Sequence, residues 1–160
     1  MNFERKLKKC GIWMACAYKA EKGVIGIEEA SERRELYQYV YYGSAKIGKP
    51  FTDKCRIIDN VGELVDVKEF FNQDTIFDFT EDTSMWGFNV LSKNINEDWD
   101  GRLITEDKIT VSGTSILVCL DGKPVVNNIE LRKFDYDELT VDKNYNIILN
   151  NGVLALFTKL

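Results

Sequence analysis

The sequence predicts an all-β protein in which short strands build the core. From Cys10 onward, runs rich in Val, Ile, Thr, Phe and Tyr alternate with Gly, Asn and Asp. No window sustains the hydrophobic periodicity of a long amphipathic helix. Because so many short strands follow one another closely, we expect a sandwich or barrel whose sheet edges are closed or covered.

Composition and length define the expected strands in chain order. They are Ile12–Lys19, Val24–Glu28, Leu36–Lys46, Arg56–Ile58, Leu64–Val67, Thr75–Phe79, Trp86–Lys93, Leu103–Thr105, Lys108–Val111, Ser115–Leu120, Lys123–Val126, Ile129–Lys133, Tyr145–Leu149 and Val153–Thr158. The segment Val67–Phe71, followed by Asn72–Asp74, suggests a single helical turn, so helix should stay below roughly 15% of the chain.

The turns are clearest in the C-terminal third. Asp121-Gly122 and Asn127-Asn128 each separate two apolar runs, and both pairs suit the positive φ angles of a two-residue hairpin. Asn150-Asn151-Gly152 separates the last two expected strands. This part of the chain is therefore predicted to be an antiparallel meander that ends in a deeply buried strand.

Length and composition predict one domain over residues 1–160, with residues 1–10 as a flexible or exchanged arm. The net charge of -5 would repel phosphate backbones and anionic lipids, so nucleic-acid and membrane partners are not expected. The apolar stretch Cys10–Tyr18 is broken by small residues and followed by Lys19, which favours mature structure over a signal peptide. We therefore expect a cytoplasmic protein.

The four cysteines, Cys10, Cys16, Cys55 and Cys119, form no C-x-x-C pair, and the chain has no histidine. A cysteine–histidine zinc pattern is therefore ruled out. We expect reduced thiols in a reducing compartment, because a core of this size does not need disulfides.

The second half of the chain resembles a cupin. The resemblance rests on residues 114–122, 123–135, 139–151 and 153–159, in which strand, turn and hairpin follow one another as they do in that family. It implies a jelly-roll β-barrel, also called a double-stranded β-helix.

Departures from the cupin pattern concern its metal site. Cupin enzymes usually bind their metal through histidines and a glutamate, whereas residues 143–147 occupy the place of the last histidine here. Phe134 stands where the family's glycine precedes an aspartate. The resemblance therefore implies the fold without its metal chemistry, and no cofactor is expected there.

Metal-independent cupin-like sugar epimerases and isomerases take a proton with a histidine base and use a tyrosine as acid. Tyr145 suits the role of that acid, but the histidine base is missing. A carboxylate such as Asp78 or Asp135 would replace it only if burial raised its pKa toward neutrality.

An acidic segment approximates the calcium loop of the EF-hand. Its candidate ligands are Asn96, Asp98, Asp100 and Asp107, with Gly101 at the glycine position. The competing interpretation is an acidic hairpin turn at Asp100-Gly101. Trp99 lies between the acids, so we expect a loop in which its ring is exposed or contacts a ligand or partner.

Alternation along the strand around residue 40 places Tyr37, Tyr39 and Tyr41 on one face. These phenols suit a sugar-stacking cavity at the barrel mouth, and equally a packed sheet face or a subunit interface. With Tyr145 and Asp78 they form the candidate ligand-binding set.

The leading hypothesis is a non-catalytic cupin-like module that binds a small polar or sugar ligand or acts in protein assembly as a homodimer or other homo-oligomer. The first alternative is a metal-independent sugar-nucleotide isomerase or epimerase. The second is a purely structural protein, for example of a virion.

Overall fold

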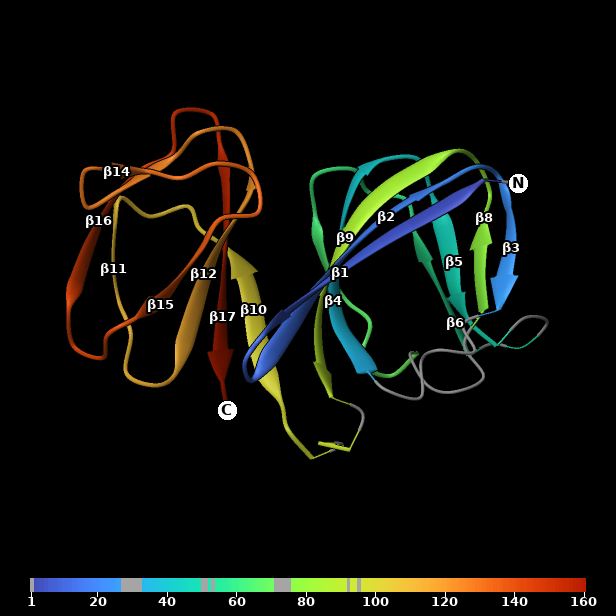
Figure 1. The fold of residues 1–160 in the computed structure, drawn as a ribbon, viewed down its shortest axis with the longest axis horizontal. Helices are drawn as coiled ribbons and strands as arrows, with labels where there is room; N and C mark the ends of the chain where they lie inside the picture. Colours follow the sequence, from blue (N-terminus) through green and yellow to red (C-terminus); the bar gives the residue numbers. More distant parts are fainter. Residues whose placement is uncertain are drawn as a thin grey trace. The chain divides into compact units, whose positions relative to one another are not determined.

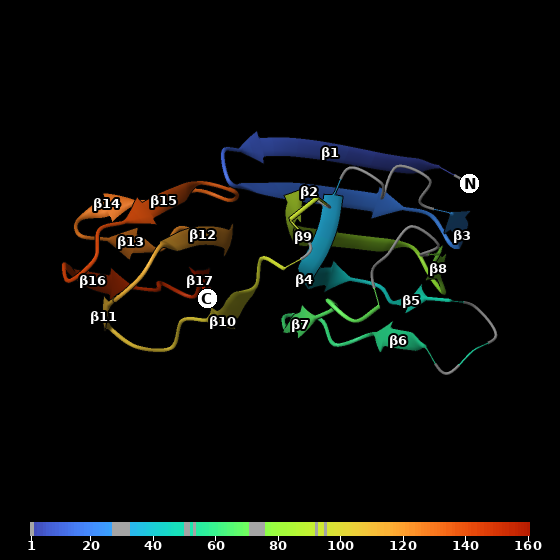
Figure 2. The same cartoon turned by 90° about the horizontal axis from the view of Figure 1, so that it is seen from below.

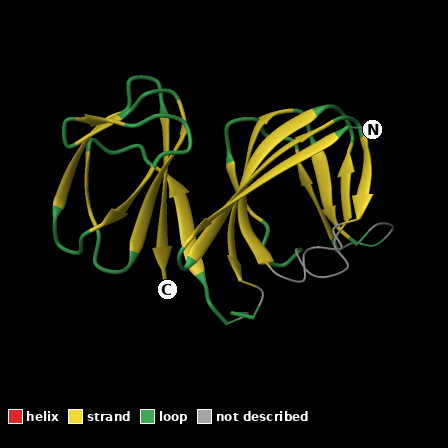
Figure 3. Ribbon diagram, in the orientation of Figure 1, coloured by secondary structure: helices red, strands yellow, loops and turns green. Residues whose placement is uncertain are grey.

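The structure is a computed structural model that describes residues 2–26, 33–49, 52, 54–70, 76–91, 93–94 and 96–160. These residues form strands, turns and loops and no helix (Figure 3), which confirms the predicted all-β class. No helix long and apolar enough to cross a membrane occurs among them. Their contacts divide the chain into two compact units, Met1–Asn96 and Glu97–Leu160. The expectation of one domain over residues 1–160 stays a prediction.

The first unit contains a five-stranded sheet in the order β1-β2-β9-β4-β7 and a four-stranded sheet in the order β3-β8-β5-β6 (Figure 1). The strands are β1 (Phe3–Cys10), β2 (Trp13–Ala20), β3 (Gly23–Gly26), β4 (Arg33–Tyr42), β5 (Ala45–Gly48), β6 (Cys55–Ile58), β7 (Leu64–Asp66), β8 (Ile76–Phe79) and β9 (Thr83–Leu91). Neighbouring strands pair antiparallel, as β1 and β2 do along their whole length (Figure 2).

Aromatic and aliphatic side chains from both sheets make the core of the first unit. Tyr18 of β2 and Met85 of β9 pack with Ile47 of β5 and with Phe77 and Phe79 of β8. The rings of Phe77 and Phe79 stack with centroids 5.5 Å apart. This core therefore joins the two sheets into a sandwich.

The second unit contains two four-stranded antiparallel sheets, β10-β17-β12-β15 and β11-β16-β13-β14. The strands are β10 (Trp99–Leu103), β11 (Lys108–Thr110), β12 (Ser115–Asp121), β13 (Val125–Val126), β14 (Ile129–Glu130), β15 (Tyr136–Leu139), β16 (Asn144–Ile148) and β17 (Val153–Lys159). Side chains from both sheets, including Leu117, Leu156 and Ile147, form its core.

Local turn chemistry accounts for several of these strand ends. Asn127 and Asn128, with φ of 47° and 65°, join β13 to β14 in the predicted hairpin. Phe134 has φ of 74°, so the backbone at the position of the family's glycine keeps the left-handed conformation. Gly43, with φ of 89°, ends β4 and splits the expected strand Leu36–Lys46 into β4 and β5.

Two predicted turns are wrong. Asp121-Gly122 does not close a hairpin, because β12 pairs with β15 and β17 while β13 pairs with β14 and β16. Asp100-Gly101 lies inside β10, where Gly101 is paired with Phe157. In both places the pairing of distant strands overrides the local turn preference of an Asp-Gly pair.

The expected helical turn is described only in part. Phe70 N donates to Val67 O at 3.0 Å, and residues 68–70 form a turn. Residues 71–74 lie outside the described residues, as do Glu28 and Thr75 at the ends of two predicted strands.

Candidate functional site

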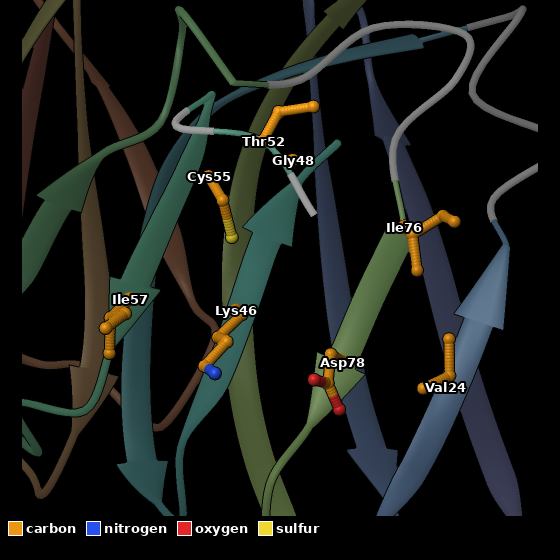
Figure 4. Close-up of a pocket in the computed structure, with 8 residues that line it drawn as sticks. All are labelled: Val24, Lys46, Gly48, Thr52, Cys55, Ile57, Ile76 and Asp78. Carbon is orange, nitrogen blue, oxygen red and sulfur yellow. The ribbon is translucent and has the colours of Figure 1, made fainter. Parts of the chain in front are cut away.

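An open groove of about 610 Å³ lies on one face of the sheet β3-β8-β5-β6. The residues that line it are Val24, Lys46, Gly48, Thr52, Cys55, Ile57, Ile76 and Asp78 (Figure 4). Ile47 and Phe77, which belong to the core, alternate with lining residues along β5 and β8. Successive side chains of a strand point to opposite faces, so the groove lies on the outer face of the sheet.

Strand register explains why this face is hollow. One level of the sheet holds Val24, Asp78, Lys46 and Ile57, in that order. The next level holds Gly26, Ile76, Gly48 and Cys55. Gly48, at the centre of the second level, adds no side chain to the surface. The second level therefore forms the floor of the groove and the first level one of its walls.

The backbone at Gly48 excludes any side chain from this floor. Its φ of 138° lies in a region that favours glycine, and a Cβ would collide with the carbonyl oxygen of Lys54. The neighbouring turn is closed by Lys49 N, which donates to Lys54 O at 3.0 Å, and by Thr52 Oγ1, which donates to Lys49 O at 2.9 Å. The fold thus keeps the floor open.

The groove combines apolar walls with two opposite charges. Val24 and Ile57 are 62% and 59% exposed, which is high for large apolar side chains. Lys46 and Asp78 are directly opposite each other on neighbouring strands. Within the described part of the chain, neither side chain makes an ion pair or a hydrogen bond. Both charges are therefore available to a ligand.

A second group of polar side chains lies inside the first unit. Tyr18, Arg33, Glu35, Gln38 and Asn89 are at most 3% exposed. Arg33 donates to the Asn89 Oδ1 at 2.6 Å and to the Tyr18 hydroxyl at 2.5 Å, and its Nη1 lies 3.7 Å from Glu35 Oε1. Gln38 Nε2 donates to Glu35 Oε2 at 2.8 Å. We call these five residues the interior polar cluster.

Burial dominates the electrostatics of this cluster. It raises the pKa of Glu35, although the Arg33 charge and hydrogen bonds from Gln38, Tyr18 and Asn89 oppose the shift. It likewise raises the pKa of Tyr18, with a further contribution from the Glu35 charge. Glu35 Oε1 and Gln38 Oε1 have no hydrogen-bond partner among the described residues. A buried carboxyl group beside a tyrosine hydroxyl is an arrangement that proton transfer can use.

Gly87 makes room for the interior polar cluster. It lies within β9, and a Cβ at this position would collide with the carboxylate of Glu35. The cluster was not predicted from the sequence, since Arg33 and Glu35 lie in a charged stretch that resembles a solvated strand end. A glycine and an asparagine, Gly87 and Asn89, within an apolar strand were the signal that a close approach occurs there.

The interior does not fit the metal that cupins usually bind. The cluster places the Arg33 guanidinium beside Glu35, which is the one buried carboxylate among the described residues. No group of three or more Cys, Asp or Glu side chains that could hold a metal ion occurs in that same part of the chain. The fixed positive charge of Arg33 among these oxygen donors opposes the binding of a metal cation.

The predicted tyrosines do not line the groove. Tyr37 and Tyr39 are paired with Phe88 and Trp86 of β9 and are each 5% exposed. The Tyr39 and Tyr41 rings lie 5.1 Å apart. Gln38, between the first two tyrosines, contacts Glu35 on the core side, so these phenols lie on the other face of the sheet.

Of the candidate ligand-binding residues, Asp78 lies in the groove. Tyr145 belongs to the second unit, where it is buried in the core and its hydroxyl accepts a hydrogen bond from Thr140 N at 2.7 Å. Asp135 closes a turn there, because its Oδ2 accepts from Arg132 N at 2.8 Å. The structure therefore does not bring Tyr145 into one site with Asp78 within a single unit.

The acidic segment 96–107 is partly extended. Trp99 is fully buried in β10 and its Nε1 donates to Glu97 Oε1 at 2.9 Å, so the prediction of an exposed ring is wrong. Asp98 and Asp100 flank it and are exposed. Alternation along the strand explains both results. Calcium binding by Asn96, Asp98, Asp100 and Asp107 remains a prediction.

The four cysteines are free thiols, as expected. Burial raises the pKa of Cys16 and of Cys119 to about 11 in each case, with smaller opposing contributions from Arg33 and from a backbone hydrogen bond of Asp121 respectively. These two thiols are therefore protonated and unreactive near neutral pH. Cys55, in contrast, is half-buried in the groove.

The fold is similar to the cupin-like jelly roll, as the residues of the second half suggested. No protein-family model and no curated protein sequence matches it.

Several solved structures are similar to this chain. HutD from Pseudomonas fluorescens SBW25 superposes with a TM-score of 0.63 at 10% identity, over 92% of this chain and 78% of that one. A conserved protein of unknown function from Pseudomonas aeruginosa PAO1 gives 0.61 at 7% identity, over 98% and 88%. A cupin 2 conserved barrel domain protein from Leptotrichia buccalis gives 0.51 at 13% identity, over 98% and 88%. At these identities the likeness establishes the fold.

Proposed function

We propose that this chain is a non-catalytic cupin-fold module that binds a small ligand in the groove on the outer face of β3-β8-β5-β6. The observation that carries the proposal is the groove itself, with its side-chain-free floor at Gly48, its exposed apolar walls and its two charges. Small-molecule sites are concave and mostly apolar, with a few polar groups that orient the ligand. The groove has each of these properties.

Fluorescence of N-phenyl-1-naphthylamine tests whether the groove binds a small molecule. This probe is apolar and uncharged at neutral pH, and we expect saturable binding that Ile57→Ser and Val24→Ser weaken. Ile12→Ser is the matched control, since Ile12 is an exposed apolar residue of the same unit outside the groove. Equal probe binding in all three variants would exclude the groove as the site.

The interior polar cluster favours a second candidate, a metal-independent sugar-nucleotide isomerase or epimerase. In such a reaction Glu35 would take a proton from a carbon next to a carbonyl, and Tyr18 would return one. The adjacent carboxyl and hydroxyl groups support this candidate, while their near-complete burial favours the binding module. Incorporation of solvent deuterium into a nucleotide sugar, lost in Glu35→Gln, would establish the enzyme.

We also propose that the module is a cytoplasmic homodimer. Four free cysteines support a reducing compartment, and the exposed apolar residues Ile129 and Ile148 of the second unit support self-association. Light scattering coupled to size exclusion measures the mass in solution. A monomer at micromolar concentration would contradict the dimer.

A further inference from the structure

Within the groove, the geometry points to one class of ligand: a small zwitterion with an apolar body, of the kind represented by the apolar α-amino acids. This inference rests on the proposed function, because it names the ligand of the same groove. It follows from the order of charged and apolar residues across the four strands.

The two charges of the groove are adjacent and opposite in sign. Lys46 and Asp78 are directly opposed on β5 and β8, so their Cβ atoms are roughly 5 Å apart. An α-amino acid carries its carboxylate and its ammonium group on one carbon atom. Lys46 therefore binds the carboxylate while Asp78 binds the ammonium group, both through charge-assisted hydrogen bonds.

The same arrangement discriminates against ligands with a single charge. An anion that pairs with Lys46 also meets the Asp78 carboxylate, and a cation that pairs with Asp78 also meets the Lys46 ammonium group. Each leaves one charge of the site uncompensated beside a like charge. A zwitterion is the small ligand that satisfies both side chains at once.

The rest of the groove accepts an apolar body. The level of Lys46 and Asp78 lies beside the level of Ile76 and Gly48, which forms the floor of the groove. Ile76 supplies an apolar surface there. Val24 and Ile57 stand at the two ends of the charged level and are largely exposed. When the apolar side chain of the ligand lies over the floor, it removes the exposed surfaces of these residues from water.

Calorimetric titration with three matched compounds tests the ligand class. L-leucine carries both charges, 4-methylpentanoate lacks the ammonium group and 3-methylbutylamine lacks the carboxylate. We expect L-leucine to bind at least about tenfold more tightly than either analogue, since each lacks one charge-assisted hydrogen bond. Equal affinity for L-leucine and one analogue would overturn the inference, as would absence of binding by all three.

Variants of Lys46 and Asp78 test whether these two residues bind L-leucine. Lys46→Gln and Asp78→Asn should each weaken L-leucine binding about tenfold. Lys108→Gln and Asp137→Asn are the matched controls, because both residues are exposed on strands of the second unit. Thermal melting establishes that each variant is folded. Unchanged affinity in Lys46→Gln and Asp78→Asn would overturn the assignment.

Charge exchange gives a sharper test. Lys46→Asp places two carboxylates side by side and should abolish L-leucine binding, whereas the double variant Lys46→Asp with Asp78→Lys restores one charge of each sign and should recover it. A double variant that binds no better than Lys46→Asp would contradict the pairing of each charge with one ligand group.

The two proposals fail separately. If the fluorescent probe binds in the groove and L-leucine does not, the zwitterion inference is overturned while the binding module stands. If neither binds there, the proposed function is overturned as well.

Discussion

Residues 1–96 and residues 97–160 share an architecture of two antiparallel sheets around a core, yet their interiors differ in polarity. Among the described residues, the first unit buries the polar side chains of Arg33, Glu35, Gln38, Thr83 and Asn89, and the second buries that of Ser115. Burying a charge is costly unless it is paired and hydrogen-bonded. The first unit therefore contains buried polar and charged side chains that stability alone does not require.

The two units also differ in backbone conformation, and here the second unit has the unusual residues. Every non-glycine residue with a positive φ in the described chain lies in the second unit, where four of the six are the asparagines of two turns. In the first unit the positive φ angles belong to glycines such as Gly43 and Gly48. The second unit thus resembles a regular scaffold of tight turns, and the first holds both candidate sites.

The largest expected effect comes from breaking the buried ion pair of the first unit. Arg33→Leu leaves Glu35 buried without its counter-charge, so we expect a loss of about 3–5 kcal/mol in the free energy of unfolding, measured in urea. Ser115→Ala, the matched change in the second unit, should cost about 1 kcal/mol. The double variant Arg33→Leu with Glu35→Leu should recover part of the loss. Strict additivity of the two single losses would contradict the pairing.

Two glycines allow a matched test of packing. Gly87→Ala forces a methyl group against the Glu35 carboxylate and should cost about 1–3 kcal/mol in unfolding free energy. At Gly113 in the second unit, a Cβ meets no atom closer than 3.9 Å, so Gly113→Ala should be close to neutral. Equal losses would mean that Glu35 does not lie against β9.

The units should also differ in the sign of their pH dependence. The pKa of Glu35 is raised above 4.5, so the folded state binds this proton more tightly and stability falls as pH rises from 4.5 through the raised pKa, by at most about 1.4 kcal/mol per pH unit. Hydrogen bonds from Arg102 lower the pKa of Glu106 to about 2, so its contribution is present above pH 4.5 and is lost as pH falls toward 2.

Melting temperatures between pH 2 and pH 8 check both signs. Glu35→Gln should remove the decline above pH 4.5, and Glu106→Gln should remove part of the decline below it. The same slope in both variants and the unmutated chain would contradict the assignment.

The smallest effect is expected from calcium at the segment 96–107. Asp98 and Asp100 flank the buried Trp99 in an extended part of the chain, whereas the ligands of an EF-hand calcium ion come from a compact loop. We expect the melting temperature to be the same with millimolar calcium and with a chelator. A shift of several degrees would support the calcium hypothesis, and an unchanged melting temperature would overturn it.

Local chemistry accounts for what the sequence predicted well. The asparagine pair at 127–128 forms a hairpin because this turn needs two positive φ angles, and asparagine accepts them more readily than most residues other than glycine. The strands around residues 115–120 and 153–158 follow from composition alone. The alternation of exposed acidic residues with Trp99 could have predicted that its ring is buried. The adjacent Asp-Gly pair favoured a turn instead.

Both candidate sites depend on partners that are far apart in the sequence. Lys46 meets Asp78 through the pairing of β5 with β8, and Arg33 meets Asn89 through the pairing of β4 with β9. Neither register is encoded in the residues around each partner. Asp78 was selected from the sequence as a candidate base and ligand-binding residue, while Lys46 carried no local signal.

The alternation along β5 and β8 separates two kinds of position. Ala45, Ile47, Phe77 and Phe79 hold the sandwich together, whereas Lys46 and Asp78, one position away, face the groove. Substitutions at the outward positions change the charge and shape of the groove without repacking the inward ones. The same pair of strands can therefore vary its surface chemistry at constant stability.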